Sequence, residues 1–438
     1  MGKFAEALFA KKTVSVWGIG YLGYTTILRL QSKGFYVNCF SFEANVFEDI
    51  KTGKYPYEYM RQAWSLNNDM PRIDIEKVNF CEDVKGMFDS NVHVIALPAF
   101  GGNYSKPEAY GKIVDIFADF SAKLSDSLVL FQSAEKAGTV DNYFIKPLKK
   151  KGIKCHFASA FRGDWSVEEF LSEEKTRILA ANDKASLDTA KEFFGILGVC
   201  FKSLGSIKEA EIYENAKSCL QYGVEAFFTQ LSLAYPDVNT NEVSAMIVKN
   251  LDLPTKRNGL NLLNHKNILQ IEHMLAGQSG DYLSIIKETQ TANMSVILFY
   301  ADILKQKGVS SVTIMGLSAE GARKDVRASA AILLAEYLNN MGMSVFIHDP
   351  YFSKEEIADI LPFAKLNDMG GGVDFTESYV LMSQNQEYNY LTQEKINKNG
   401  LYDAKIIIDG VGALKYFSFS PKTIYHEVGD GTLKALIK

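Results

Sequence analysis

The chain has 438 residues, of which 47 are Lys or Arg and 52 are Asp or Glu, so its formal net charge is −5. This balance offers no strongly basic field for nucleic acid or for an anionic membrane, and we expect neither as a partner. Apolar residues at 47% and charged residues at 23% are typical of globular proteins, and the length exceeds that of one compact core. Two or three domains are therefore expected.

The five cysteines are scattered, with no C-x-x-C pair and no histidine at metal-ligand spacing. This pattern favours a reduced, cytoplasmic protein without a bound metal. The apolar stretch at 5–10 and later runs such as 92–100 are too short for a secretory signal or a membrane span. We expect neither.

The first predicted elements are a strand, a glycine turn and a helix. The strand at 14–17 runs directly into G-I-G-Y-L-G at 18–23, and apolar residues at helical spacing continue to residue 32. A second strand, 35–42, is followed by Glu43, at the distance from the turn where a ribose-binding carboxylate is expected. The pattern predicts a nucleotide site, with a purely structural glycine turn as the alternative. Its residues would be Gly18, Gly20, Tyr21, Leu22, Gly23 and Glu43.

Further strands and helices extend this unit into a doubly wound α/β sheet. Strands are predicted at 92–97, 127–131, 153–158 and 177–181, and helices at 110–124 and 141–151. From 208 to about 235 the chain has the character of one long helix, and helices continue through 242–251 and 266–305. An apolar stripe on the long helix either supplies dimer contacts or packs on its own domains; it comprises Tyr213, Leu220, Phe227 and Leu231.

A second nucleotide-like unit follows. It has a strand at 312–316, a helix at 328–340 and a strand at 344–348 that ends in Asp349-Pro350, with a late strand at 404–408. Because it lacks the G-x-G-x-x-G turn, we expect it to hold a different ligand or none. The predicted fold is α/β, with two Rossmann-like doubly wound domains joined by a long central helix. The expected domains are 1–205, a helical linker or dimerisation region at 206–305, and 306–438.

Three stretches together resemble the UDP-glucose/GDP-mannose dehydrogenase family. They are the glycine turn, Ala210-Glu211 at the start of the long helix, and Gly316-Leu317 followed by D-V-R-A-S at 325–329 and H-D-P-Y at 348–351. The resemblance implies an N-terminal NAD domain, a homodimer formed through the central helix and a C-terminal domain for a nucleotide sugar. It also implies an oxidoreductase that makes precursors of polysaccharides or glycans.

The resemblance breaks down at the catalytic positions. The family oxidises a sugar 6-alcohol through an aldehyde to a carboxylate, and a cysteine captures the aldehyde. In our alignment Leu263 stands at that cysteine and Asn267 at the following aspartate, and neither can do this chemistry. The other departures are Glu214 and Ser218 for a lysine and an asparagine of the central helix, Ala160 and Phe161 in the S-P-E motif, Glu320 for a lysine, and Ser41 for the ribose aspartate.

The first hypothesis is therefore an oxidoreductase of altered, two-electron chemistry. His265, Lys266 and Glu214 are its candidate catalytic groups, since such a reaction needs a base and an oxyanion partner but no thiol. Each residue also has an interpretation without a functional role. His265 would then be a surface histidine, Lys266 an exposed lysine and Glu214 a solvated helix glutamate. Arg327 either contacts substrate or forms a structural pair with Asp325.

Two alternatives stay open. The second hypothesis is a non-catalytic relative that binds a nucleotide or nucleotide sugar as a regulatory or assembly partner. It is favoured by Ser41 and by Ala99-Phe100, where the family has a T-P pair. The third is a misaligned loop, with the family activity maintained by a nucleophile from elsewhere.

Overall fold

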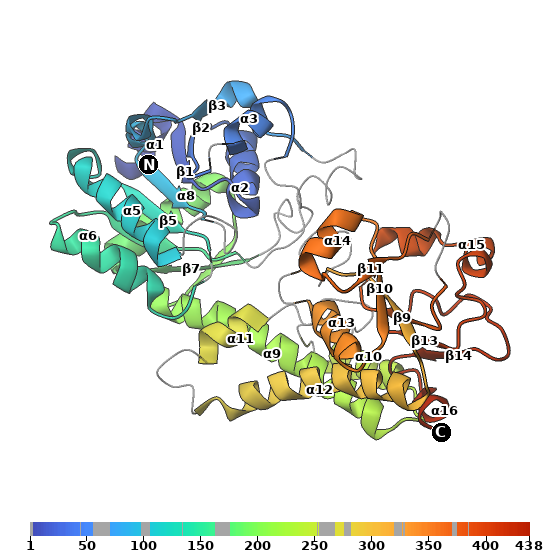
Figure 1. The fold of residues 1–438 in the computed structure, drawn as a ribbon. Helices are drawn as coiled ribbons and strands as arrows, with labels where there is room; N and C mark the ends of the chain where they lie inside the picture. Colours follow the sequence, from blue (N-terminus) through green and yellow to red (C-terminus); the bar gives the residue numbers. More distant parts are fainter. Residues whose placement is uncertain are drawn as a thin grey trace. The chain divides into compact units, whose positions relative to one another are not determined.

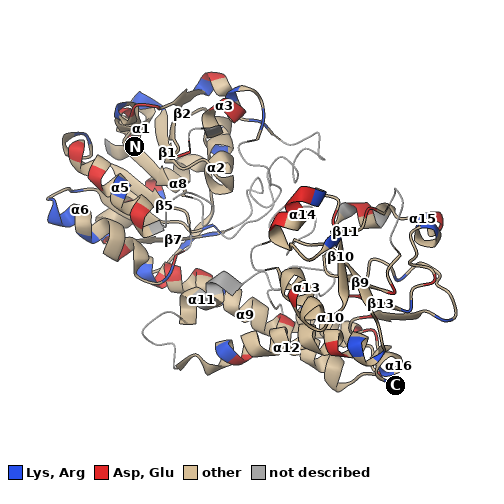
Figure 2. Ribbon diagram, in the orientation of Figure 1, with Lys and Arg blue, Asp and Glu red and all other residues tan. Residues whose placement is uncertain are grey.

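The computed structural model forms two units, 1–216 and 217–438 (Figure 1). It describes residues 3–43, 45–55, 71–97, 106–133, 135–162, 176–251, 253, 268–275, 282–318, 326, 329–369, 375–383 and 385–438. Acidic and basic residues are interspersed along the helices of both units (Figure 2).

The first unit holds an eight-stranded sheet in the order β3-β2-β1-β4-β5-β6-β7-β8. Neighbours pair in parallel except β6 and β7, which are antiparallel. The crossover from β3 to β4 places a topological switch point at the carboxyl ends of β1 and β4, where open α/β sheets bind ligands. The strands are β1 (Thr13–Trp17), β2 (Tyr36–Phe40), β3 (Val78–Phe80), β4 (Val92–Ile95), β5 (Leu128–Phe131), β6 (His156–Ser159), β7 (Arg177–Ala181) and β8 (Phe201–Ser203).

Helices cover both faces of this sheet because its central strands are apolar on both sides. On β4, Val94 packs in the core under α2 and α8, while the next residue, Ile95, packs in the core under α5 and α6. The helices of this unit are α1 (Lys3–Lys11), α2 (Tyr21–Ser32), α3 (Asn45–Lys51), α5 (Lys106–Asp119), α6 (Lys146–Lys150) and α8 (Lys184–Leu197).

One predicted helix is irregular. The segment expected at 141–151 starts as a π-helix, Asp141–Ile145, and continues as α6. Pro147 lies in the first turn of α6. Proline has no N–H to donate and its ring crowds the preceding turn, so the wider turn before it relieves that conflict.

The predicted long central helix is confirmed as α9 (Ile207–Ala234), of 28 residues. It is followed by α10 (Thr240–Leu251), α11 (Ile268–Leu275) and α12 (Ser284–Gln306). The helical stretch expected at 266–305 is thus two helices, and Gly277 and Gly280 lie in the sequence between them. Glycine weakens a helix because it loses the most backbone entropy.

The second unit carries a six-stranded parallel sheet in the order β11-β10-β9-β12-β13-β14. This is the Rossmann strand order, so the predicted pair of Rossmann-like domains is confirmed. The strands are β9 (Ser311–Met315), β10 (Ser344–His348), β11 (Lys365–Leu366), β12 (Ser378–Leu381), β13 (Ile406–Asp409) and β14 (Ile424–Glu427). The remaining helices are α13 (Ala330–Asn340), α14 (Lys354–Ile360), α15 (Gln393–Lys398) and α16 (Leu433–Ile437).

Two cores fill the second unit, one on each face of its sheet. Helices α12 and α13 pack with Val312 and Ile314 on one face, and Tyr388 and the α15 residue Ile396 pack on the other. Across the described ranges of both units, no helix combines the length and the apolarity that crossing a membrane requires.

Candidate functional site

The glycine turn lies at the carboxyl end of β1, at the switch point of the first sheet. Gly18 has a φ of +94°, and its N–H donates to the carbonyl of Phe40 at 2.8 Å. A Cβ on Gly18 would lie 2.8 Å from the Ala96 carbonyl oxygen, and one on Gly23 would lie 1.9 Å from the Gly18 carbonyl oxygen. Only glycine therefore fits at the first and third positions of the motif.

Helix α2 starts directly from this turn. Gly20 is its N-cap, with no side-chain cap, and the Gly20 carbonyl accepts the N–H of Tyr24 at 2.9 Å. The first N–H groups of a helix lack intrahelical acceptors and carry partial positive charge, which suits a phosphate. A glycine turn packed this tightly against a helix N-terminus fits the pyrophosphate of a dinucleotide.

Tyr21 and Leu22, the other predicted residues of the turn, contact the end of the β6 segment. The Arg162 guanidinium donates to the Leu22 carbonyl at 3.0 Å, and its carbon lies 5.9 Å from the centre of the Tyr21 ring. Arg162 follows the segment aligned with the family's S-P-E motif. Sequence reasoning did not identify this arginine as a partner of the turn.

The ribose position lies just past β2. Ser41 is the first residue after the strand, and its hydroxyl accepts the N–H of Glu43 at 3.1 Å. Glu43 is half-buried. The carboxylate predicted from the sequence is therefore adjacent to the serine that replaces the aspartate expected there.

A buried polar cluster at the start of α9 was also not predicted. The Glu211 carboxylate accepts the N–H groups of Gly138 and Val140, the latter at 3.0 Å. The Asn215 amide donates to the carbonyls of Glu135 and Glu211 at 2.7 and 2.8 Å. The cluster fastens the loop after β5 to the helix. Burial raises the pKa of Glu211 to about 7, against the opposing effect of these two N–H donors.

Glu214 lies one turn after Glu211 and is only 6% exposed. The interpretation of this residue as a solvated helix glutamate is therefore wrong. The other predicted site residues, His265, Lys266 and Arg327, lie outside the described residues, as do Leu263 and Asn267.

In the second unit, the end of β9 has the same backbone geometry as the end of β1 in the first unit, but the turn that follows it differs. Gly316 has a φ of +93°, and its N–H donates to the His348 carbonyl at 2.8 Å, as Gly18 does to Phe40. Here, however, the Asp349 carboxylate accepts the N–H of Leu317 at 2.7 Å and that of Tyr351 at 3.0 Å. The buried carboxylate of Asp349 is thus committed to two backbone N–H groups of its own unit.

Comparison with known proteins finds a similarity to one family of enzymes. Residues 313–416 match the model described as UDP-glucose/GDP-mannose dehydrogenase family, UDP binding domain. The chain is 21% identical to the UDP-N-acetyl-D-mannosamine dehydrogenase of Methanocaldococcus jannaschii over 91% of this chain and 92% of that one. It is 23% identical to the UDP-glucose 6-dehydrogenase of Rickettsia conorii over 90% and 93%.

The chain is thus similar to the UDP-glucose/GDP-mannose dehydrogenase family, through its matched domain and through relatives that align over most of its length. The fold is shared with a UDP-glucose dehydrogenase from the archaeon Pyrobaculum islandicum, with a TM-score of 0.74. That match has 17% sequence identity and covers 95% of this chain and 97% of the other.

All five cysteines lie within the described residues, and burial makes four of them poor nucleophiles. Thiolate is the reactive form of cysteine, and a raised pKa suppresses it. Burial raises the thiol pKa at four of them: well above the usual value at Cys39, to about 11 at Cys81 and Cys219, and to about 12 at Cys155. The fifth, Cys200, is exposed and lies directly before β8, the outermost strand of its sheet.

Proposed function

We propose that this protein is an NAD-dependent oxidoreductase that performs one two-electron step on a nucleotide sugar. The observation that carries the proposal is the retained glycine turn in a chain whose thiols are buried or remote. Gly18 and Gly23 leave no room for a Cβ, which fits a pyrophosphate cradle. Leu263 at the aligned cysteine position removes the group that holds the aldehyde for a second oxidation.

The reaction that matches these residues is alcohol–carbonyl interconversion. Bound NAD would take a hydride from the carbinol carbon, while a base of the protein takes the hydroxyl proton. The alcohol thus loses two electrons and two hydrogens and becomes a carbonyl. Glu214, His265 and Lys266 remain the proposed catalytic groups. Of these three residues only Glu214 lies within the described ranges, where it is 6% exposed.

The second unit is the proposed site of the nucleotide sugar, with Arg327 as a contact to it. Support comes from the matched family model, whose description is a UDP binding domain. The relatives named above act on UDP-N-acetyl-D-mannosamine and UDP-glucose according to their names. We propose a substrate of this class, used for polysaccharide or glycan precursors in the cytoplasm.

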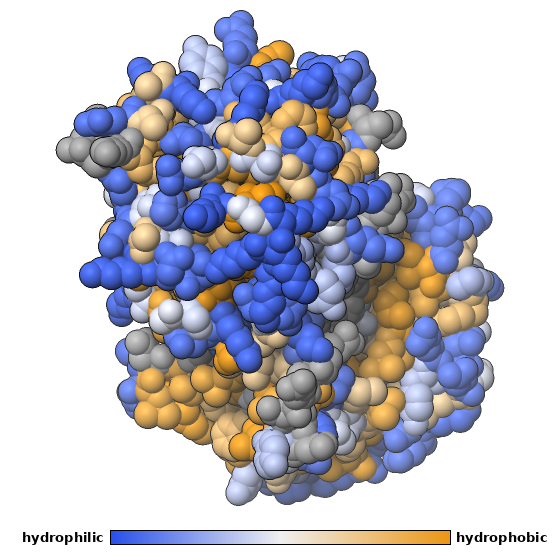
Figure 3. All heavy atoms as spheres, turned by 90° about the vertical axis from the view of Figure 1, so that its left-hand side faces the viewer, coloured by the Kyte–Doolittle hydropathy of each residue, from blue (hydrophilic) through white to orange (hydrophobic). Residues whose placement is uncertain are grey.

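A homodimer is proposed through α9. Leu220 and Phe227, two members of the apolar stripe at seven-residue spacing, are 59% and 55% exposed. Leu231, also assigned to the stripe, packs instead against the core of its own unit. Figure 3 shows one face of the molecule, on which apolar patches lie between hydrophilic side chains.

The second candidate function is a non-catalytic binding partner. Ser41 at the ribose position favours it, since the family's aspartate is the group that holds a dinucleotide there. In this case the second unit would still bind a nucleotide sugar.

Calorimetric titration separates the two candidates. The full chain is titrated with NAD, NADH and a panel of UDP-, GDP- and CDP-sugars, and any pair that binds is then followed at the NADH absorbance band. We expect NAD binding and one NADH per sugar. Two NADH per sugar would contradict the altered chemistry, and sugar binding without NAD affinity would leave the non-catalytic partner.

A further inference from the structure

A buried arginine joins the end of β6 to the first two turns of α2. Arg162 lies three residues after β6 and is only 8% exposed. Its Nη1 nitrogen donates to the Leu22 carbonyl at 3.0 Å and to the Thr26 hydroxyl at 3.1 Å. Leu22 is the second residue of α2, and Thr26 lies one turn further along. One guanidinium nitrogen therefore holds two successive turns of the helix that starts at the glycine turn.

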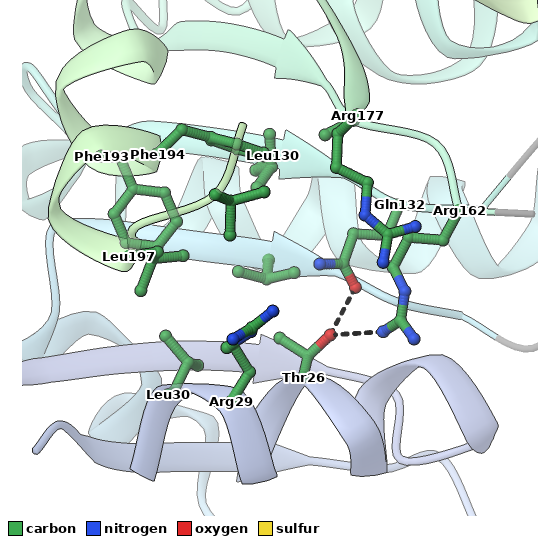
Figure 4. A pocket seen from close by; sticks show the side chains of 13 residues that line it. Thr26, Arg29, Leu30, Leu130, Gln132, Arg162, Arg177, Phe193, Phe194 and Leu197 are labelled. Atoms are coloured by element: carbon green, nitrogen blue, oxygen red, sulfur yellow. Dashed lines mark hydrogen bonds between the residues drawn. The ribbon is translucent and has the colours of Figure 1, made fainter. Parts of the chain in front are cut away.

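The same contact continues to the end of β5. The Thr26 hydroxyl, which accepts from Arg162, donates to the amide oxygen of Gln132, the residue after β5, at 2.7 Å. The backbone N–H of Arg162 donates to the Gln132 carbonyl at 2.9 Å. Figure 4 shows the side chains of Thr26, Gln132 and Arg162 pointing toward one another between α2 and the strand ends. The helix is thus fastened through side chains to the carboxyl ends of two strands.

This fastening matters because the glycine turn has little rigidity of its own. Glycine has the greatest backbone freedom of any residue, and the turn at 18–23 contains three. Gly20, the N-cap of α2, offers no side chain to the N–H groups of the first turn. Hydrogen bonds from a guanidinium are stronger than those from a neutral donor, so they suit a contact that fixes a helix end. The ring of Tyr21, at the first position of α2, adds a second contact, since the guanidinium carbon lies 5.9 Å from its centre.

We propose that Arg162 is a positioning residue for the dinucleotide. It holds the first two turns of α2 against the strand ends, so the N–H groups of the glycine turn are ordered before a ligand arrives. A site that is ordered in advance binds more tightly, because the ligand does not bear the cost of ordering it. The role of Arg162 depends on the dinucleotide site proposed at 18–23, and it is exerted through α2 and not by contact with the ligand.

Hydrogen exchange of the full-length protein without ligand tests the anchor itself. Arg162→Gln removes the charge, and Thr26→Val removes the hydroxyl but keeps the shape. In both variants the amides of 24–27, which bond within α2, should exchange about tenfold faster relative to those of β5. Comparison with β5 cancels any loss of global stability. Thr26→Ser keeps the hydroxyl and should restore the wild-type ratio.

Ser90→Ala is the matched control. Ser90 is fully buried, and its hydroxyl contacts the carbonyls of Thr13 and Val92 at 2.9 and 2.8 Å, at the amino-terminal edge of the same sheet. The variant thus loses buried hydrogen bonds of the first unit without touching α2. Its exchange ratio between α2 and β5 should equal that of the wild type within about twofold. Circular dichroism checks the fold of each variant.

Calorimetric titration with NAD then measures the effect on binding. We expect about tenfold weaker binding by Arg162→Gln and Thr26→Val, and wild-type affinity within about twofold for Thr26→Ser and Ser90→Ala. Recovery of affinity with the hydroxyl in Thr26→Ser is a result that loss of packing alone would not give.

Two results would overturn the proposal: an unchanged exchange ratio in Arg162→Gln, or faster exchange in α2 with unchanged NAD affinity. If the wild type bound no NAD, the proposed dinucleotide site would be wrong, and the exchange ratio would still decide whether Arg162 orders the turn.

Discussion

At the proposed ribose position of the first unit, Glu43 is the candidate carboxylate, because Ser41 has none to offer. Glu43→Gln keeps the shape but removes the charge, and a hydrogen bond to a charged group contributes about 1.5–3 kcal/mol. We expect about tenfold weaker NAD binding, measured by calorimetry. Glu48→Gln, on the exposed face of α3, is the control and should leave the affinity unchanged. Equal affinities in both variants would place the ribose contact elsewhere.

The carboxyl of Glu211 gives stability a pH dependence. Its pKa in the folded protein is raised from 4.5 to about 7, so between these values the folded state binds a proton that the unfolded state has released. This contribution is fully present below pH 4.5 and is lost as the pH rises through about 7. The loss amounts to about 3 kcal/mol.

Glu211→Gln cannot titrate, and it also loses one of the two accepted N–H bonds. Its unfolding free energy, measured by urea denaturation at pH 5 and pH 8, should therefore fall less with rising pH than that of the wild type. Parallel pH profiles for the two proteins would show that Glu211 titrates normally.

At the scale of elements, the junction of β1 and α2 depends on close backbone contact. Gly23→Ala places a Cβ 1.9 Å from the Gly18 carbonyl oxygen, so the turn must open. We expect a loss of stability of about 1–3 kcal/mol and loss of NAD binding. Gly195→Ala, inside α8, meets no atom within 4 Å and should stabilise the protein by up to about 1 kcal/mol. Thermal unfolding measures the stability of both variants, and calorimetry measures their NAD binding. If Gly23→Ala bound NAD with wild-type affinity, the glycine turn would not be the pyrophosphate site.

Elements with a clear period were predictable from the sequence, and short ones were not. The expected strand at 344–348 and that at 177–181 match β10 and β7 at both ends. Strands β3, β8 and β11 have three, three and two residues, too few to show an alternation of apolar and polar positions. They are defined by pairing with neighbours that are distant in sequence.

The whole molecule offers a test of the proposed dimer. Leu220→Glu and Phe227→Glu each place a charge at a side chain that is more than half exposed in one chain, so the folded protomer should tolerate them. If α9 forms the interface, each charge is buried there and light scattering should show monomers. Tyr416→Glu, at a side chain that is 86% exposed on the second unit, is the matched control. Intact dimers in both α9 variants would place the interface on another surface.

Sites assembled from distant parts of the chain were the hardest to predict. The glycine turn is contiguous, so its three glycines and Glu43 could be found from spacing alone. The buried cluster around Glu211 and Asn215 joins the start of α9 to the loop after β5, and these residues share no motif and meet only in the fold. The roles of His265, Lys266 and Arg327 stay predictions, since they rest on the aligned sequence.

The carboxylate of Asp349 has a consequence for binding stoichiometry. Ser41 and Asp349 occupy equivalent places, each directly after the second strand of its sheet. In the second unit this acid already accepts two backbone N–H groups, and Ser318 stands where the second glycine of a G-x-G-x-x-G turn would be. A second dinucleotide would have to compete with the protein's own hydrogen bonds. Despite having two Rossmann sheets, each chain should therefore saturate with one equivalent of dinucleotide.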